Sequence, residues 1–315
     1  MKSIEWGFLI VNYLFLGGLS AGLFFVSALA LYLNGSESAG LNRIARWGAL
    51  LAPWPVALGS LLLIFDLGNW YRFYLLFLHF KWHSPMSIGS WLLLLFTGVA
   101  FTYTWSWLSP QERARLAVRL RLPASWNIAP PVSRRSLAAI GSPLSLAVAI
   151  YTGVLLGAVQ SRPFWNTNLV AQLFLFSAIS TGCALLIIVL SLGRTRPEPR
   201  ELRILYTLDV VLITLEFFIV LPYVIHGELS VGAVRDSLDL ILGGPFTIAF
   251  WLVFVGTGLL APLVLELREL GPAVIRQAPI SFHRGLAVAA GLLVVVGGYL
   301  LRYIFVYAGQ MSAFR

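Results

Sequence analysis

The chain has 315 residues, of which 59% are hydrophobic and only 11% are charged. Soluble globular domains carry about 25% charged residues, so this composition excludes an ordinary soluble protein. The net charge of +9 comes almost entirely from loop arginines, which makes it a membrane-topology signal rather than a nucleic-acid footprint. Apolar runs of about 20 residues recur without a period-2 alternation, so the sequence predicts membrane-spanning helices rather than barrel strands.

We therefore predict an all-α integral membrane protein with eight spans. In chain order they cover residues 6–33, 48–66, 86–108, 141–159, 168–192, 204–225, 244–265 and 285–308. The first span is too long for a signal peptide and has no small-residue cleavage site, so we expect it to be retained. Its small residues Gly17, Gly18, Ser20 and Gly22 favour close helix packing. Pro53 and Pro55 fall in the first turns of the second span, where a missing N–H matters least.

The basic residues divide unequally between the two sides of the membrane. Fifteen of the 22 lysines and arginines lie in the loops after spans one, three, five and seven. Positive charge marks the cytoplasm, so we expect both termini outside, in the periplasm of a bacterial inner membrane. The Arg-rich loop 109–140 is then cytoplasmic, either as a connector between two halves or as a simple topology anchor. The polar turn 66–91 lies on the periplasmic side.

Charged side chains inside the predicted spans each need a reason, because one at the bilayer centre costs at least about 2.5–3.5 kcal/mol. Asp66, Asp209, Glu216 and Arg302 are such residues. Asp209 and Glu216 are seven residues apart, which places them on one face of the sixth span, about 10 Å apart along its axis. That spacing suits a step in a proton path. The alternative, two acids neutralised by arginines of neighbouring helices, stays open.

Several polar residues fall at a similar depth near the periplasmic ends of the first four spans. They are Asn12, Asp66, Ser87, Trp91 and Tyr151. Each alone is explained by an interhelical hydrogen bond, but their common depth predicts a pocket. A lipid-soluble quinone would suit it, because it needs donors for its oxygens, an acid that exchanges protons and apolar walls. Asp66 is the candidate for the proton exchange.

The remaining polar residues of the turn 66–91 are Arg72, His79, Lys81 and His83. His79 and His83 are four residues apart and could share a helix face as metal ligands. We favour docking of a partner subunit for all four, and we predict no metal site. The chain's four histidines all lie at or beyond helix ends, so no pair is placed to bind a haem within the bilayer.

Several stretches resemble the polysulfide reductase membrane-subunit family, the NrfD-type quinone anchors. They are NYLFLGGLSAG in the first span, DLGNWYRF and SPMSIGSW around the polar turn, YTGVLLGAVQSRPFWNT closing the fourth span, and LRYIFVYAGQ at the end of the eighth. The resemblance covers almost the whole chain in the same order. One departure is visible, since related members place a histidine on the first helix, where this chain has Phe15 in the neighbouring turn.

The resemblance implies eight helices in two four-helix bundles, residues 1–160 and 161–315, with no haem or iron–sulfur cluster in this chain. It implies a quinone, menaquinone or ubiquinone, in the first bundle near Asn12, Asp66 and Tyr151. It also implies a ferredoxin-like iron–sulfur partner docked on the periplasmic face and a molybdopterin catalytic subunit beyond it. The chain would then be the quinone-reactive subunit of a respiratory oxidoreductase complex.

Two other classes of function remain as alternatives. A secondary transporter would use Asp66, Glu216 and Arg302 as ligands, but we see no obvious pair of glycine- or proline-broken helices at the midplane. A purely structural membrane anchor would hold a soluble enzyme without any quinone chemistry. The terminal substrate of the complex and the direction of electron flow do not follow from the sequence.

Overall fold

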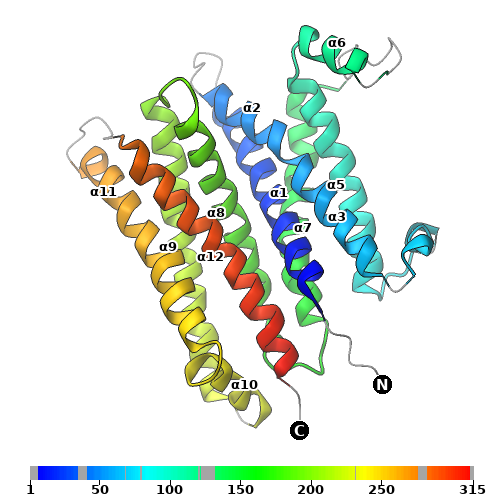
Figure 1. The fold of residues 1–315 in the computed structure, drawn as a ribbon, viewed down its shortest axis with the longest axis vertical. Helices are drawn as coiled ribbons and strands as arrows, with labels where there is room; N and C mark the ends of the chain where they lie inside the picture. Colours follow the sequence, from blue (N-terminus) through cyan, green and yellow to red (C-terminus); the bar gives the residue numbers. More distant parts are fainter. Residues whose placement is uncertain are drawn as a thin grey trace.

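The computed structural model describes residues 6–34, 41–67, 69–78, 80–119, 121, 132–230, 232–275 and 282–312. Every regular element in these ranges is a helix (Figure 1). Eight helical segments within them are long and apolar enough to cross a membrane, which confirms the predicted number of spans. The chain is a multi-pass membrane protein.

The spans are formed by single helices or by joined pairs. They are α1 (Phe8–Leu33), α2 (Asn42–Leu51) with α3 (Pro53–Asp66), α5 (Pro85–Trp107), α7 (Arg134–Gly157), α8 (Leu169–Leu192), α9 (Pro199–Leu229), η4 (Ile248–Leu260) with α11 (Ala261–Ile275), and α12 (Arg284–Met311). Short helices lie in the connections: η2 (Trp70–Arg72), α4 (Leu75–Leu78), α6 (Pro110–Arg119) and α10 (Ala233–Leu242).

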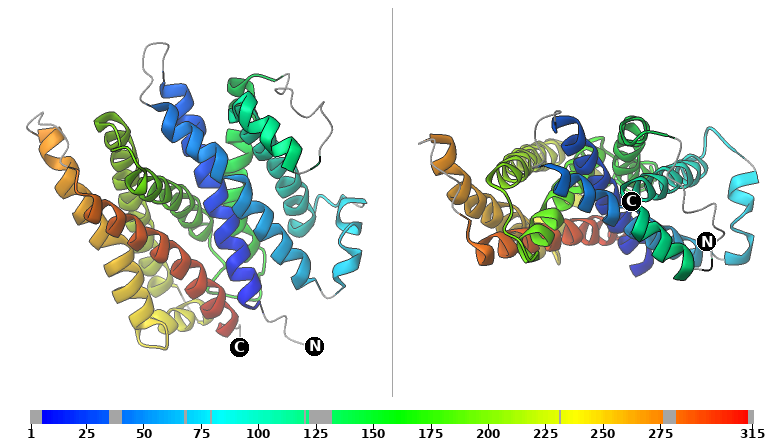
Figure 2. Two further views of the ribbon diagram at one scale, coloured as in Figure 1. Left: turned by 45° about the horizontal axis from the view of Figure 1, so that its top comes forward. Right: turned by 90° about the horizontal axis from the view of Figure 1, so that it is seen from above.

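Helices α1 and α8 lie at the centre of the assembly, as both views in Figure 2 show. Helix α1 packs against α3, α7 and α8, and α8 also packs against α9 and α12. At their crossing, a Cβ on Gly182 would lie 2.5 Å from the carbonyl carbon of Gly22, so only glycine fits there. This confirms the packing role predicted for Gly22. The division into two bundles stays a prediction, because one helix from each half meets at this central contact.

The second span is broken near its middle, which corrects the sequence-based interpretation of Pro53 and Pro55. The span begins at Asn42, and α2 ends at Leu51 so that Pro53 opens α3. Proline has no N–H, so Pro53 leaves the carbonyl of Ala49 without its helical partner. The hydroxyl of Thr104 in α5 donates to that carbonyl at 2.5 Å, and Ser20 in α1 donates to the carbonyl of Ala52. Neighbouring helices thus satisfy the backbone at the break.

The seventh span is longer than predicted and has an unusual start. It runs over Ile248–Ala273, whereas the sequence prediction ended it at residue 265, before the acids Glu266 and Glu269. Its first part, η4, is a π-helix, a form that is rare and wider than an α-helix. Within it, Gly258 lies against α12, where an added Cβ would come within 2.8 Å of the Gly297 Cα.

The two ends of the described chain are tied together. The side-chain amide of Gln310 accepts from the backbone N–H of Trp6 and donates to its carbonyl, both at 2.7 Å. Arg162 donates to the carbonyls of Gln310 and Ser312, and the Trp165 indole donates to the Phe305 carbonyl at 2.6 Å. Figure 1 shows both termini at the same end of the helices. We call this the terminal end and its opposite the arginine-rich end; which end faces the periplasm stays a prediction.

Candidate functional site

An apolar cavity of about 220 Å³ lies near the terminal end, between α3, α4 and α5. Side chains of α3 and α5 form two walls, and aromatic and leucine side chains of the segment containing α4 close it. The lining residues are Ser60, Leu63, Ile64, Leu67, Phe73, Leu76, Phe77, Ser90, Leu93, Leu94 and Thr97. Apolar walls with a few hydroxyl groups are typical of a site for a small lipid-soluble ligand.

A second, more polar cavity of about 500 Å³ adjoins it, and Leu67 and Leu76 line both. Arg72, Lys81 and Ser87 contribute polar groups to its walls. The Ser87 hydroxyl also accepts from the backbone N–H of Lys81 at 3.0 Å, which fixes the end of the turn against the start of α5. The apolar cavity therefore adjoins a larger cavity that has cationic side chains in its walls.

Two buried polar groups beside the apolar cavity have no hydrogen-bond partner in the described part of the chain. One is the hydroxyl of Ser60, which lines the cavity, and the other is the indole nitrogen of Trp91. The Trp91 ring lies 6.2 Å from that of Phe77, a lining residue. A buried unsatisfied donor costs about 1–3 kcal/mol, so a ligand with acceptor oxygens would fit these surroundings.

Asp66 is the last residue of α3 and stands directly before Leu67, which lines both cavities. Its side chain is exposed rather than half-buried, and the described residues provide it with no ion pair. It lies seven residues beyond Gly59, whose Cα faces Leu16 and Tyr13 of α1. Two helical turns separate them, so Asp66 lies on the α1-facing side of α3, next in sequence to a lining residue but on a different face of the helix from the cavity.

Tyr151 lies on the other side of α5 from the apolar cavity. Its ring packs against Gly89, where an added Cβ would overlap the phenol. Its hydroxyl interacts electrostatically with that of Tyr13 in α1, and both side chains are buried. The Tyr13 hydroxyl has no well-formed hydrogen bond among the described residues. Sequence analysis missed Tyr13, although its position next to Asn12 was a signal.

Asn12 faces a third direction, toward α12. Its amide nitrogen donates to the Phe8 carbonyl at 2.7 Å, and the side chain interacts with the Tyr299 hydroxyl. Phe15, one turn further along α1, packs edge-on against the Tyr299 ring at 5.4 Å. Phe15 therefore makes an aromatic contact between α1 and α12.

The five predicted pocket residues thus lie at four places rather than in one cluster. Ser87 and Trp91 lie beside the cavities, Asp66 at the end of α3 next to Leu67, and Tyr151 and Asn12 at two separate helix contacts of α1. Neither of the two cavities is lined by all five. Their common depth stays a prediction, and depth carries no information on the direction of each side chain.

The predicted docking residues lie on an exposed surface. Arg72, Lys81 and His83 are exposed, and His79 lies outside the described residues. The Arg72 guanidinium stacks over the Tyr71 ring at 5.6 Å. Around them, exposed aromatic side chains include Tyr71, Tyr74, Phe80 and Trp82. Exposed aromatic and cationic groups together are the composition expected of a protein interface.

The buried acids of the second half lie at helix contacts. Asp209 is fully buried, accepts from the Ser180 hydroxyl at 2.6 Å, and interacts with the carboxyl group of Glu266 in α11. Glu216 interacts electrostatically with Arg302 of α12. Arg302 also donates to the Ser177 hydroxyl at 3.1 Å. One predicted acid thus has an arginine neighbour, and the other has a second acid.

Glu266 and Glu269 extend this set toward the arginine-rich end, and sequence analysis missed both. Glu269 is 3% exposed and contacts Nδ1 of the exposed His283 at 2.9 Å, where α12 begins. Neither oxygen of Glu266 has a hydrogen-bond donor in the described structure. The signal available in the sequence was their three-residue spacing, which places both acids on one helix face. The predicted span ended before either of them. Within the described residues, no three acidic, histidine or cysteine side chains are arranged to hold a metal ion.

Eight helical spans with an apolar cavity near one end, and with no large domain outside the spans among the described residues, define a multi-pass helical membrane protein. The polysulphide reductase NrfD family model matches residues 1–313, so the chain belongs to that family. It is 31% identical to protein NrfD of Escherichia coli over 99% of this chain and 96% of that protein. It is 30% identical to a component of the polysulfide reductase of Wolinella succinogenes, covering 98% and 95%. A selenate reductase subunit of Mesobacillus selenatarsenatis is 26% identical, covering 98% of this chain and 74% of that subunit.

Proposed function

We propose that the chain is the quinone-reactive membrane subunit of a respiratory oxidoreductase in a bacterial inner membrane, with both termini periplasmic. The observation that carries the proposal is the apolar cavity with unsatisfied buried donors beside it, which adjoins a second cavity lined by Arg72 and Lys81. Relatives named as components of polysulfide and selenate reductases support the setting.

The residues beside the cavity would bind and orient the ring. Ser60 and Trp91 offer free donors to its oxygens, and the leucine and phenylalanine walls exclude water. When bound, a menaquinone or ubiquinone supplies two-electron, two-proton redox chemistry. Asp66 is exposed at the end of α3, next in sequence to Leu67 of the cavity wall, so its carboxylate would exchange protons between the site and the periplasmic side. Tyr151, with Tyr13, would hold α7 and α1 in place beside α5, and Asn12 would hold α1 against α12, so that these polar residues support the helices around the site.

Electrons would pass to or from an iron–sulfur subunit docked on the surface that contains Arg72, Lys81 and His83, with His79 beside them in sequence. A molybdopterin catalytic subunit would lie beyond it. The exposed aromatic residues and the positive charges of this surface support docking of an acidic, partly apolar partner. Replacing Lys81 with Glu should then release the partner during purification, whereas Arg235→Glu, an exposed change at the same end, should not.

Asp209 and Glu216, together with Glu266, would form part of a proton path through the second half. Two carboxyl groups in contact, without a cation between them, can share and pass a proton. If the path joins the periplasmic site to the cytoplasm, quinone turnover would translocate protons.

Quinol oxidation by the purified complex tests the proposal. The variant Asp66→Asn keeps the side-chain size but cannot exchange a proton, so turnover should fall about 100-fold, the range of general acid–base catalysis. Asp236→Asn, an exposed acid of α10 at the same end, is the matched control and should keep full turnover. Wild-type turnover in Asp66→Asn would remove the role assigned to Asp66.

The same preparation separates the alternatives. A complex that carries no quinone and does not respond to quinone-site inhibitors would support the structural anchor. Uptake of a solute by vesicles containing the chain alone would support the transporter. The break at Pro53 and the π-helical start of the seventh span are irregular, but they lie in helices with different partners rather than facing one site.

A further inference from the structure

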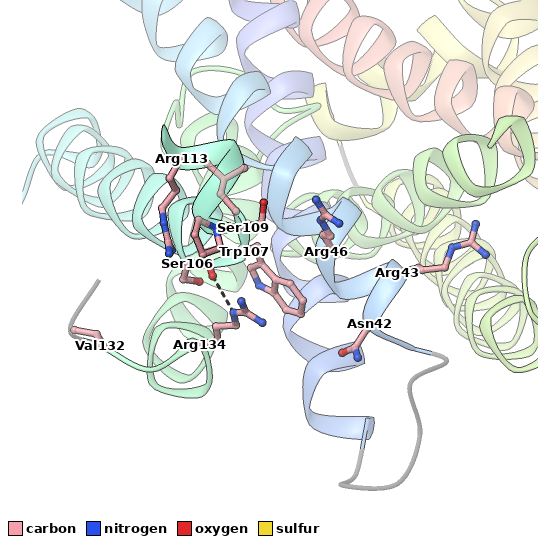
Figure 3. Close-up of a pocket in the computed structure, with 11 residues that line it drawn as sticks. Asn42, Arg43, Arg46, Ser106, Trp107, Ser109, Arg113, Val132 and Arg134 are labelled. Atoms are coloured by element: carbon pink, nitrogen blue, oxygen red, sulfur yellow. Dashed lines mark hydrogen bonds between the residues drawn. The ribbon is translucent and has the colours of Figure 1, made fainter. Parts of the chain in front are cut away.

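A cavity of about 610 Å³ lies at the arginine-rich end, far from the proposed quinone site. It is formed by α2, the end of α5, the start of α6 and the start of α7 (Figure 3). Its lining residues are Asn42, Arg43, Arg46, Ser106, Trp107, Leu108, Ser109, Pro110, Arg113, Val132 and Arg134. Four of these are arginines and none is acidic.

Two of the four arginines already have partners outside the cavity. Arg46 pairs with Glu112 at 2.6 Å. The backbone N–H of Ser109 donates to the Glu112 carboxylate and is the main reason why the pKa of Glu112 lies below its usual range. A hydrogen bond from the Ser109 side chain and the nearby Arg46 lower this pKa further. Arg43 points away from the others in Figure 3 and contacts Glu201 at 3.4 Å. These two positive charges are compensated.

The other two arginines have no acidic partner in the described part of the chain. Arg113 is only 8% exposed, and its Nε has no hydrogen-bond partner there. Arg134 stacks over the Trp107 ring at 4.5 Å and donates through Nε to the Ser106 carbonyl at 2.9 Å. Figure 3 shows both side chains extending to the region beside Ser106. Burying the Arg113 guanidinium without an anion beside it costs free energy, so the cavity favours a negatively charged ligand.

The surroundings favour a ligand that comes from the membrane. The cavity lies where three spans end, and Leu108 and the exposed Val132 border it. Below it, Trp54 of α3 and Phe101 of α5 are exposed and their rings lie 5.9 Å apart. Phe101 is seven residues from the lining residue Leu108, which places both on one face of α5 about 10 Å apart along it, so apolar side chains continue from the cavity toward the bilayer interior.

We propose that this cavity binds the phosphate group of an anionic phospholipid, with Arg113 and Arg134 as its ligands and the acyl chains along Trp54 and Phe101. Guanidinium groups pair well with phosphate oxygens because their planar donors match two acceptors at once. Basic cavities between spans at the positively charged side are typical sites for such headgroups. The bound lipid would hold α6 against the ends of α2, α5 and α7.

Lipid binding to the delipidated, intact complex tests the proposal by native mass spectrometry. Cardiolipin and phosphatidylglycerol should bind more tightly than phosphatidylethanolamine. Arg113→Gln and Arg134→Gln should each weaken cardiolipin binding by about tenfold, the effect of one lost hydrogen bond to a charged group. Arg115→Gln removes the same charge from an exposed position on α6 and should change binding less than about twofold. Arg113→Lys, which keeps the charge, should lose less than Arg113→Gln.

Three results would overturn the proposal. Equal weakening by Arg113→Gln, Arg134→Gln and Arg115→Gln would indicate diffuse attraction to the whole surface. Equal binding of anionic and zwitterionic lipids would exclude an anion site. Displacement of cardiolipin by millimolar inorganic phosphate, with no need for acyl chains, would make the ligand a free phosphate. If Arg113→Gln prevents assembly, Arg134→Gln and Arg113→Lys still decide between these outcomes.

Discussion

The phenol ring of Tyr151 in α7 lies directly on the backbone of Gly89 in α5, and no side chain could stand between them. Gly89 belongs to the SPMSIGSW stretch that follows the polar turn, and Tyr151 begins the YTGVLLGAVQ stretch that closes α7. Two separate sequence motifs are therefore parts of one contact. Through Tyr151 the contact also reaches Tyr13 of α1, so three spans meet beside the proposed site.

Gly89→Ala tests this contact. The added methyl group would force the Tyr151 ring out of place, so we expect a loss of about 1–3 kcal/mol in stability, as for overpacking of a core. If Tyr151 orients the quinone, the KM for quinol should rise as well. Thermal unfolding and quinol kinetics of the purified complex measure the two effects.

Gly98 provides the matched control for this substitution. It lies on the same helix, and an added Cβ there would meet no atom within 4 Å. Gly98→Ala should therefore be neutral or slightly stabilising, since alanine favours a helix by about 1 kcal/mol over glycine. Equal stability and kinetics of the Gly89→Ala and Gly98→Ala variants would contradict the role of the contact.

Depth and direction differ in how far they can be predicted from sequence. The position of Asn12, Asp66 and Tyr151 along their spans follows from hydropathy, because the bilayer fixes where each helix enters and leaves. Direction changes by about 100° per residue, so it depends on which helices become neighbours. Asn12 turns to α12 whereas adjacent Tyr13 turns to Tyr151, and nothing local in the sequence distinguishes the two.

The predicted end of the seventh span is wrong for a related reason. The sequence prediction leaves Glu266 and Glu269 outside the seventh span, since charged residues usually end an apolar run. In the structure both are almost fully buried among neighbouring helices, where the cost of lipid contact does not apply. The second span begins earlier than predicted because the break at Pro53 is repaired by Thr104 of another helix, which donates to the free Ala49 carbonyl, a compensation that only the packed structure reveals.

Gln310 should stabilise the protein by joining the two ends of the chain. In Gln310→Leu both the N–H and the carbonyl of Trp6 lose their partner, so unfolding free energy should fall by about 1–3 kcal/mol. Gln172→Leu replaces an exposed glutamine of α8 and should leave thermal unfolding unchanged. Equal midpoints for the two variants would show that the contact contributes nothing.

The pairing of Glu112 with α2 predicts a pH dependence. Because its pKa is lowered in the folded protein, its contribution to stability is present above the unfolded pKa and is lost as pH falls through the folded one. The carboxylate is partly exposed, so the contribution is small. Glu112→Gln should lower the unfolding midpoint by at most about 3 °C at pH 7, and the difference should shrink as pH falls below the unfolded pKa of about 4.3 and vanish below the folded pKa. A difference that persists at low pH would assign the effect to shape rather than charge.

The buried acids Asp209 and Glu266 of the second half give a prediction about how proton translocation is coupled to quinol oxidation. Asp209→Asn keeps an oxygen for the Ser180 hydroxyl, and Glu266→Gln keeps the side-chain length, so both should assemble. Neither can carry a proton. If they form the path, the number of protons translocated per electron should fall toward that of the quinone site alone, while quinol oxidation in detergent continues.

Proton pumping by the complex in sealed vesicles, measured beside its turnover, decides this prediction. Glu228→Gln, a change at a half-buried acid at the end of α9 that pairs with Arg235, is the control and should leave the ratio unchanged. A path through Asp209 and Glu266 requires that the ratio fall in both variants, because protons must pass each group in turn. If pumping persists in both variants, the contact between the two carboxyls is structural. A complex in which even the unaltered chain moves no protons would assign Glu216 to its electrostatic pairing with Arg302 alone.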